Sequence, residues 1–497
     1  MSANVTSSKK VLINSVVYTC SGLLQKCFGM FLLPLYTAYL TTEDYGIQSI
    51  ANSFINTMSF IAAFSLFSAV LRFYVDLKED EEKLKRFYGS MSLFVFLSSI
   101  GFGILLTIFR APLSRYVFSG VDYYPVILVC LISLVFSCQH TIYGHILRSQ
   151  QRAVKASVFG LLYFLTTVCL NIVLVVGMKM GAVGVLVATA ISNFLYTAYF
   201  VIEMSIKRTI RFCLDWGLIK EALKYSIPII PHNLSTNIAQ LISKVFISGT
   251  HSLADLGVYT VAVQFGHVAD TIQTYVNSAY GPWLYENLKE QREGYKANIR
   301  KTVKMIIMVI GLFLIGIVFF AQDYILLFVN EEFAAAWRYV PFIVAVYAIK
   351  TVYYFYVNVL FYHKEASRKL FIATLSSSFL DIVLAALLIP CLGVYGSILA
   401  EGIAMLLRVS IVFFISTMYE KIGLYIRDFV VNFFVIIFFM SVGLAPSFFV
   451  FGEAFSLVNF AYKLVVIGLY CLIILGCYRR EVLAVLKRLN RKMGHCK

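Results

Sequence analysis

The chain has 497 residues, of which 60% are hydrophobic and only 14% are charged, and its net charge is +16. Soluble domains carry about a quarter charged residues, so this composition excludes an ordinary soluble domain. Nucleic-acid binding is not expected either, because the lysines and arginines recur in every second loop instead of gathering on one soluble segment.

Apolar runs of about 18–25 residues recur along the whole length, which is the span needed to cross the hydrocarbon core of a bilayer. The ten cysteines are scattered singly with no CxxC pair, so neither a disulfide framework nor a metal site is expected. The sequence predicts an all-α integral membrane protein with about fourteen spans. Their ranges are 11–40, 46–72, 88–109, 124–147, 156–178, 181–204, 226–249, 256–281, 302–321, 338–362, 369–390, 393–416, 428–451 and 457–478.

Three short patterns recur in the same order about 210 residues apart. Thr42–Ile47 is repeated at Leu253–Val258, and Asn171–Leu174 is repeated at Asp381–Leu384. The third pattern contains Gly181 and Gly184, which recur as Gly393 and Gly396. Such a duplication predicts two pseudo-symmetric six-helix bundles followed by two further helices. Within the first pattern, Asp44 and Asp255 are expected to start helices, because short acidic side chains cap exposed amides.

Most of the 42 lysines and arginines fall in the tails and in alternate loops, which the positive-inside rule places in the cytoplasm together with both termini. The opposite side receives few of them: Arg110, Arg115, Lys179, Arg338 and Lys463. The expected organisation is an N-lobe (1–206), a cytoplasmic linker (207–225), a C-lobe (226–420), and a last segment (421–497) with two helices and a basic amphipathic tail.

Several ionisable residues fall inside or at the ends of the predicted spans. At the bilayer centre each costs roughly 2.5–3.5 kcal/mol on insertion scales, so these groups are expected to face a water-filled cavity or one another. They are Lys26, Arg72, Lys244, Asp270, Lys350, Asp381, Glu401 and Arg408.

Four cations, Lys26, Arg72, Lys244 and Lys350, are predicted to line a cavity that binds an anion, because lysine and arginine suit phosphate. Arg72 and Lys244 have an alternative, since each could extend its charge to the lipid phosphates. Asp270 is either the partner of Lys244 or an ion-coupling group.

The remaining charges, Asp381, Glu401 and Arg408, fit a structural salt-bridge cluster as well as a functional one. Prolines in the lead helices of the two halves, Pro34, Pro228 and Pro231, are candidate hinges because proline removes a backbone hydrogen bond. No P-loop is present, so no nucleotide cofactor is expected, and no catalytic residue is assigned.

Four stretches, LPLYTAYLTTEDYGIQSI from Leu33, LRFYVD from Leu71, SIPIIPHNLS from Ser226 and ADLGVYTVA from Ala254, resemble polysaccharide-type flippases of the multidrug/oligosaccharidyl-lipid/polysaccharide exporter superfamily. The resemblance covers at least residues 11–416. It implies a MATE-like fold with a central cavity lined by helices 1, 2, 7 and 8. It also implies transport of undecaprenyl-diphosphate-linked O-antigen or capsule units to the outer face of a bacterial plasma membrane, coupled to a proton or sodium gradient.

One departure from that family concerns the late part of the seventh span. Its members commonly have an Asp-Arg pair there, where this chain has Ser243 and Lys244, so the charge is kept and the acid is lost. Expected partners are the lipid-linked glycan and membrane lipids, with a polysaccharide polymerase and chain-length machinery as further partners.

Three alternatives remain. The first is a flippase for lipid II or sporulation-type peptidoglycan precursors. The second is an ion-coupled multidrug exporter, which would require an acidic rather than a basic cavity. The third is a membrane polymerase of lipid-linked sugars, which is disfavoured because the outer loops at 110–123 and 322–337 are short.

Overall fold

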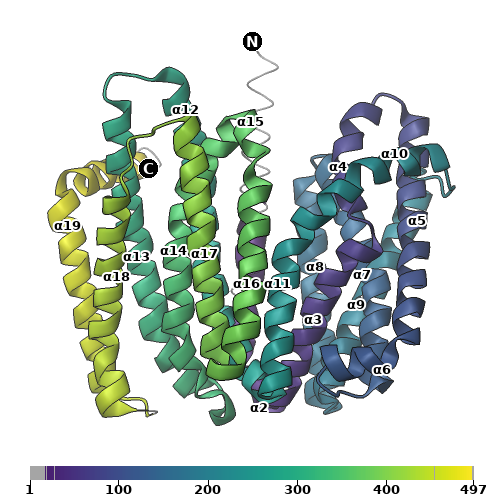
Figure 1. Cartoon of the computed structure of the whole chain (residues 1–497), viewed down its shortest axis with the longest axis horizontal. Coiled ribbons are helices and arrows are strands. Elements are labelled where there is room, and N and C mark those ends of the chain that lie inside the picture. The colour runs from purple at the N-terminus through teal and green to yellow at the C-terminus, as the bar shows by residue number, and fades with distance from the viewer. Residues whose placement is uncertain (1–16, 18, 27, 453, 495–497) are drawn as a thin grey trace. The chain divides into compact units, whose positions relative to one another are not determined.

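A computed structural model describes residues 17, 19–26, 28–452 and 454–494, and within these residues it contains helices and no strands (Figure 1). In the part of the chain that the structure describes, ten helices are long and apolar enough to cross a membrane. An eleventh span results if α3 and α4, which meet at a bend of 50°, are taken together. The predicted all-α, multi-pass membrane fold is confirmed.

The chain forms two compact units. The first unit contains the described residues up to Thr260 together with Ser378–Ala400. After helical residues at 19–26 and 28–31, its elements are α2 (Leu33–Tyr39), α3 (Thr42–Ala62), α4 (Leu66–Leu77), α5 (Glu81–Ile108), α6 (Arg110–Pro112), η1 (Leu113–Val117), η2 (Tyr123–Ile127), α7 (Leu128–Ser149), α8 (Ala153–Asn171), η3 (Ile172–Gly177), α9 (Gly181–Ile206), α10 (Trp216–Ser226), η4 (Ile227–Ile229) and α11 (Ile230–Thr250).

The second unit contains Val261–Ser377 and the described residues from Glu401 onward, so α12, α16 and α17 are each divided between the units. Figure 1 shows α13, α18 and α19 side by side in the second unit. The remaining elements are α12 (Leu253–Glu290), α13 (Tyr295–Phe328), η5 (Glu331–Phe333), α14 (Ala336–Tyr362), α15 (Lys364–Ser367), α16 (Leu370–Leu392), α17 (Val394–Tyr419), α18 (Ile426–Pro446), η6 (Ser447–Phe451) and α19 (Leu457–Gly494).

Every predicted span corresponds to helix, although the first one begins outside the described residues. The spans that are not apolar enough to be counted by hydropathy include α11 and α12, whose sequences are rich in Asn, Gln, Ser, Thr and His. Polar residues inside spanning helices face protein or water rather than lipid. A polar site within the membrane is therefore expected at these two helices.

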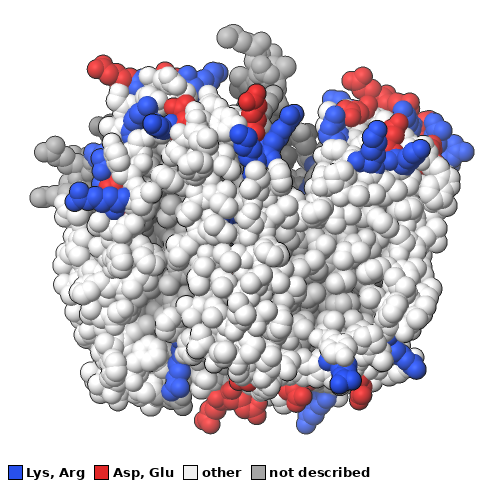
Figure 2. Space-filling view, in the orientation of Figure 1, with Lys and Arg blue, Asp and Glu red and all other residues white. Residues whose placement is uncertain are grey.

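On the face seen in Figure 2, charged side chains collect at the two ends of each unit and leave an almost uncharged band between them. The predicted linker 207–225 contains a helix, α10, which packs against α4 and α5. The boundary between the two compact units differs from the boundary between the two predicted lobes. The repeat assigns α11 to the C-lobe, but in the structure α11 belongs to the first unit. The two lobes inferred from the repeat remain a prediction.

The repeated patterns start helices in the same way. At α3, the Asp44 amide donates to Thr41 Oγ1 and the Thr41 amide donates to Asp44 Oδ2, both at 3.1 Å. At α12, the Asp255 amide donates to Ser252 Oγ at 3.0 Å and that hydroxyl donates to Asp255 Oδ2 at 2.6 Å. The predicted role of both acids in helix capping is confirmed.

The two repeated patterns also contact each other. A Cβ atom on Gly46 would lie 2.0 Å from the carbonyl oxygen of Leu253, and one on Gly257 would lie 1.8 Å from the carbonyl oxygen of Thr42. Thr42 corresponds to Leu253 in the repeat, and Gly46 corresponds to Gly257. Each glycine therefore receives the equivalent carbonyl of the other helix, and the first turns of α3 and α12 meet backbone to backbone. We call this contact the glycine junction.

A buried polar cluster joins α13 to α19. Lys463 is 0% exposed, and its ammonium group lies 3.0 Å from the carboxylate of Asp323 and 2.7 Å from Gln322 Oε1. It also donates to the carbonyl oxygen of Phe319 at 3.1 Å. Lys463 lies in the second turn of α19, which begins at Leu457 as the last predicted span does, and α19 packs against α13. Its assignment to the outer side of the membrane stays a prediction.

Replacing Asp323 by asparagine is expected to lower the stability of the protein by about 3–5 kcal/mol, because a buried lysine loses its counter-charge. Thermal unfolding in detergent measures the effect. The double variant Asp323→Leu with Lys463→Met is the control, and it is expected to recover most of the loss since no buried charge remains. Equal unfolding temperatures for the parent and Asp323→Asn would contradict this assignment.

Candidate anion-binding site

The four predicted cavity cations have different surroundings. Arg72 lies in α4 with 51% of its side chain exposed, and Nη1 is 2.6 Å from Asp76 Oδ2 one turn later. Its charge is therefore compensated by an acid that belongs to the same LRFYVD stretch. Lys26 lies in the helical segment 19–26 with its side chain exposed.

Lys350 forms an ion pair with Asp270. Lys350 Nζ on α14 lies 2.6 Å from Asp270 Oδ1 on α12, and the Tyr354 hydroxyl donates to the same oxygen at 3.3 Å. The ammonium group also lies over the rings of Tyr347 and Tyr354, at 5.3 and 5.7 Å from their centroids. Of the two sequence interpretations of Asp270, the structure shows a charge partner, but the partner is Lys350 instead of Lys244.

The ion pair is one contact of a polar ladder between α12 and α14 that the sequence interpretation missed. Gln273 Nε2 donates to the carbonyl oxygen of Tyr347 at 2.7 Å and to Thr351 Oγ1 at 3.0 Å. Asn358 Nδ2 donates to Asn277 Oδ1 at 2.6 Å. Asp270, Gln273 and Asn277 are three and four residues apart, so this spacing on one helix face was a signal that could have found the ladder.

The charges of α17 extend this network. Glu401 interacts electrostatically with Lys350, Arg408 and Asp270, and Arg408 Nε donates to Ser377 Oγ at 2.8 Å. These four charged residues are two acids and two bases, so the network as a whole is neutral. The predicted association of Glu401 with Arg408 therefore has structural support. Asp381 lies in the part of α16 that belongs to the first unit.

Lys244 is different, because its ammonium group contacts neutral oxygens. Its ammonium group on α11 donates to Ser53 Oγ at 2.7 Å and approaches the carbonyl oxygen of Ser49 at 3.5 Å, both on α3. Among the described residues, no carboxylate forms an ion pair with this half-buried lysine. A desolvated cation without a counter-charge is a site for an anion.

The seam between α3 and α11 explains why Lys244 is held at this place. Ser49, Ser53 and Thr57 recur every fourth residue and form one face of α3. Thr57 Oγ1 lies 3.2 Å from the carbonyl oxygen of Asn237 on α11. Small residues let spanning helices approach closely, so the stem of Lys244 lies along the seam and its ammonium group meets hydroxyl and carbonyl oxygens.

The three candidate hinge prolines all lie where a helix is interrupted or begins. Pro34 is in the first turn of α2, directly after a break in helix at Leu32. Pro228 lies in the 3₁₀ turn η4, and Pro231 lies in the first turn of α11. Proline lacks an amide proton and is accommodated there without loss of a hydrogen bond. The hinge role itself remains a prediction.

The chain is similar in sequence to a protein family and to a protein of known sequence. Residues 11–288 match the family described as polysaccharide biosynthesis protein. A protein of Haemophilus influenzae named "Uncharacterized membrane protein" is 23% identical over 372 residues, which are 73% of this chain and 87% of the relative.

Among solved structures, the lipid II flippase MurJ in an inward closed conformation gives a TM-score of 0.71 at 16% identity, over 94% of this chain and all of that one. An inward-facing MATE multidrug transporter of the MOP superfamily gives a TM-score of 0.58 at 16% identity, over 79% of this chain and 94% of that one. The predicted MATE-like fold is confirmed. Since the family match covers more than half of its length, the chain belongs to the polysaccharide biosynthesis protein family.

Proposed function

We propose that this protein is a flippase that moves undecaprenyl-diphosphate-linked oligosaccharide units from the cytoplasmic to the outer face of the bacterial plasma membrane by alternating access. The observation that carries the proposal is Lys244, a half-buried cation bonded only to serine oxygens in the described part of the chain. The family and the fold support transport of a lipid-linked precursor, and the anionic part of such a precursor is its diphosphate.

The charges of the spans support an anionic cargo. The network of Asp270, Lys350, Glu401 and Arg408 contains two acids and two bases, and Arg72 is paired with Asp76. Lys26 has an exposed side chain, so Lys244 is the desolvated cation of this set that gains most from an incoming phosphate. We therefore propose that the diphosphate binds at Lys244. The glycan would follow it through the polar interior while the polyprenyl chain stays in the bilayer.

The membrane potential can drive such a cargo outward. With both termini in the cytoplasm and the cell interior negative, moving two negative charges outward gains about 4–5 kcal/mol per 100 mV. A proton or sodium gradient would add to this, and the balanced acids Asp270 and Glu401 are the residues through which we expect coupling. Membrane lipids and a polysaccharide polymerase with its chain-length machinery are the expected partners.

A second candidate is a flippase for lipid II, because the structural match to MurJ extends over 94% of this chain. Lipid II has the same polyprenyl diphosphate, so Lys244 would serve either cargo. A multidrug exporter is disfavoured, because the uncompensated charge is positive and the usual cargo of such exporters is cationic. An enzyme acting on lipid-linked sugars finds no support in the family or the fold, which are those of transporters.

Transport by purified protein in proteoliposomes tests the proposal. Vesicles would contain a short undecaprenyl-diphosphate-linked oligosaccharide, lipid II, or a fluorescent cationic drug, and a membrane-impermeant glycan-modifying reagent would report which molecules cross. We expect protein-dependent movement of the oligosaccharide lipid that increases with an imposed potential. Movement of lipid II alone would favour the second candidate, and movement of the drug alone would refute the proposal.

A further inference from the structure

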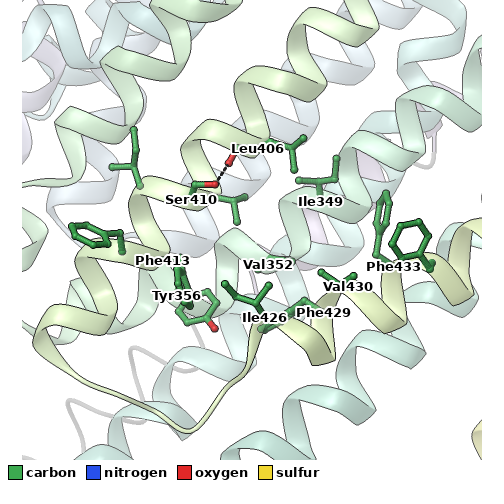
Figure 3. A pocket seen from close by; sticks show the side chains of 14 residues that line it. Ile349, Val352, Tyr356, Leu406, Ser410, Phe413, Ile426, Phe429, Val430 and Phe433 are labelled. Atoms are coloured by element: carbon green, nitrogen blue, oxygen red, sulfur yellow. Dashed lines mark hydrogen bonds between the residues drawn. The ribbon is translucent and has the colours of Figure 1, made fainter.

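An apolar groove of about 810 Å³ lies in the second unit between α14, α17 and α18 (Figure 3). The hydroxyl of Ser410 lines it but is turned away, bonded to the carbonyl oxygen of Leu406 at 2.8 Å. The groove therefore presents mainly apolar side-chain atoms to a bound molecule. Its lining includes Ile349 and Val352 on α14, Leu406 and Phe414 on α17, and Val430 and Phe434 on α18.

The groove has the length of one leaflet. Its wall on α18 runs from Ile426 to Phe434, which at 1.5 Å per residue is about 12 Å. One leaflet contributes about half of the roughly 30 Å hydrocarbon core. The wall begins at the first residue of α18, and the connection from α17 to α18 that precedes it contains two charged residues, Glu420 and Lys421. The groove thus starts at a lipid–water boundary and ends near the middle of the bilayer.

Arg427 marks that boundary. It is exposed, and within the described part of the chain no ion pair involves it, whereas Arg300 and Lys304 share Asp428 at 2.6 and 2.9 Å. Arg427, Val430 and Phe434 are three and four residues apart and share one face of α18. Arg427 is therefore a cation in the first turn of α18, next to the start of the groove wall at Ile426 and at the level where a lipid carries its phosphate.

We propose that this groove binds one acyl chain of an anionic phospholipid, with the lipid phosphate at Arg427. The length favours a leaflet lipid over the substrate's tail, because an undecaprenyl chain is far longer than the groove. The site is distinct from the proposed cargo site, because Lys244, at which we propose that the diphosphate binds, is not among the groove residues. Its occupant would connect α18, an appended helix, to α14 and α17.

Lipid binding to the full-length protein in detergent tests this proposal. Native mass spectrometry would compare phosphatidylglycerol with phosphatidylcholine after delipidation, and a photoactivatable phosphatidylglycerol would identify the peptides that it touches. We expect a preference of about fivefold for the anionic lipid. We also expect crosslinks to peptides of α17 and α18.

Matched variants locate the site. Val430→Trp fills the groove and is expected to reduce binding of both lipids, whereas Val431→Trp places the same side chain on the neighbouring face of α18, where 52% of Val431 is already exposed. Arg427→Gln is expected to remove the preference, and Arg208→Gln, at an exposed arginine of the first unit, to keep it. Unchanged binding by Val430→Trp, or crosslinks only elsewhere, would overturn the proposal. Displacement of phosphatidylglycerol from the groove by undecaprenyl phosphate would overturn it as well.

Discussion

Replacing Lys244 by glutamine is expected to slow translocation of the lipid-linked oligosaccharide by about 10- to 100-fold, the loss of one charge-assisted hydrogen bond in a desolvated site. Glutamine is one bond shorter than lysine but keeps an N–H donor for Ser53 Oγ, which now accepts from Lys244 at 2.7 Å. The variant therefore removes the charge without opening the seam between α3 and α11. Initial rates in proteoliposomes measure the effect.

Two further variants separate charge from structure. Lys244→Arg restores the positive charge and is expected to recover most of the rate, since arginine also binds phosphate. Ser53→Ala keeps the lysine but removes its orienting hydroxyl, and about a fivefold loss is expected because the ammonium group still has the carbonyl oxygen of Ser49 beside it. A Lys244→Gln protein that is monodisperse, folded and as fast as the parent would remove this lysine from the cargo site.

Features that depend only on residues close together in the sequence were predictable. A membrane span is such a feature, because about twenty consecutive apolar residues are stable as a helix that crosses the bilayer. The caps at Thr41 and Ser252 are equally local, because each hydroxyl meets an amide three residues later. The repeat then supplied the order of the helices, which is why the fold class could be predicted without any knowledge of contacts.

The pairing of charges was not predictable, because it depends on which helices are neighbours. Asp270 and Lys350 are 80 residues apart, and only the packing of α12 against α14 brings them together. Lys463 shows the same limit, because the sequence placed it inside the last predicted span, 457–478, but could not indicate that Asp323 and Gln322 of α13 would surround its ammonium group. The short amphipathic helix α10 was hidden within the linker, because eleven residues are too few to form a span.

Replacing either glycine of the glycine junction by alanine is expected to destabilise the protein by about 1–3 kcal/mol, the cost of overpacking a tight contact. The new Cβ atom would stand 2.0 Å from the carbonyl oxygen of Leu253 in the Gly46 variant and 1.8 Å from that of Thr42 in the Gly257 variant. Both obstacles are backbone atoms of capped helix ends, so relief requires the first turns of α3 and α12 to separate.

The reciprocity of the junction predicts the outcome of the double variant. Once one alanine has forced the two helices apart, the second finds the space already open, so the combined loss should be close to that of one substitution and well below the sum. Gly249→Ala is the control, because a Cβ atom there would meet nothing within 4 Å and alanine favours helix. Thermal unfolding in detergent measures all four proteins. Additive losses would show that the two glycines act at independent contacts, and a Gly257→Ala protein as stable as the control would show that the helices can shift without cost.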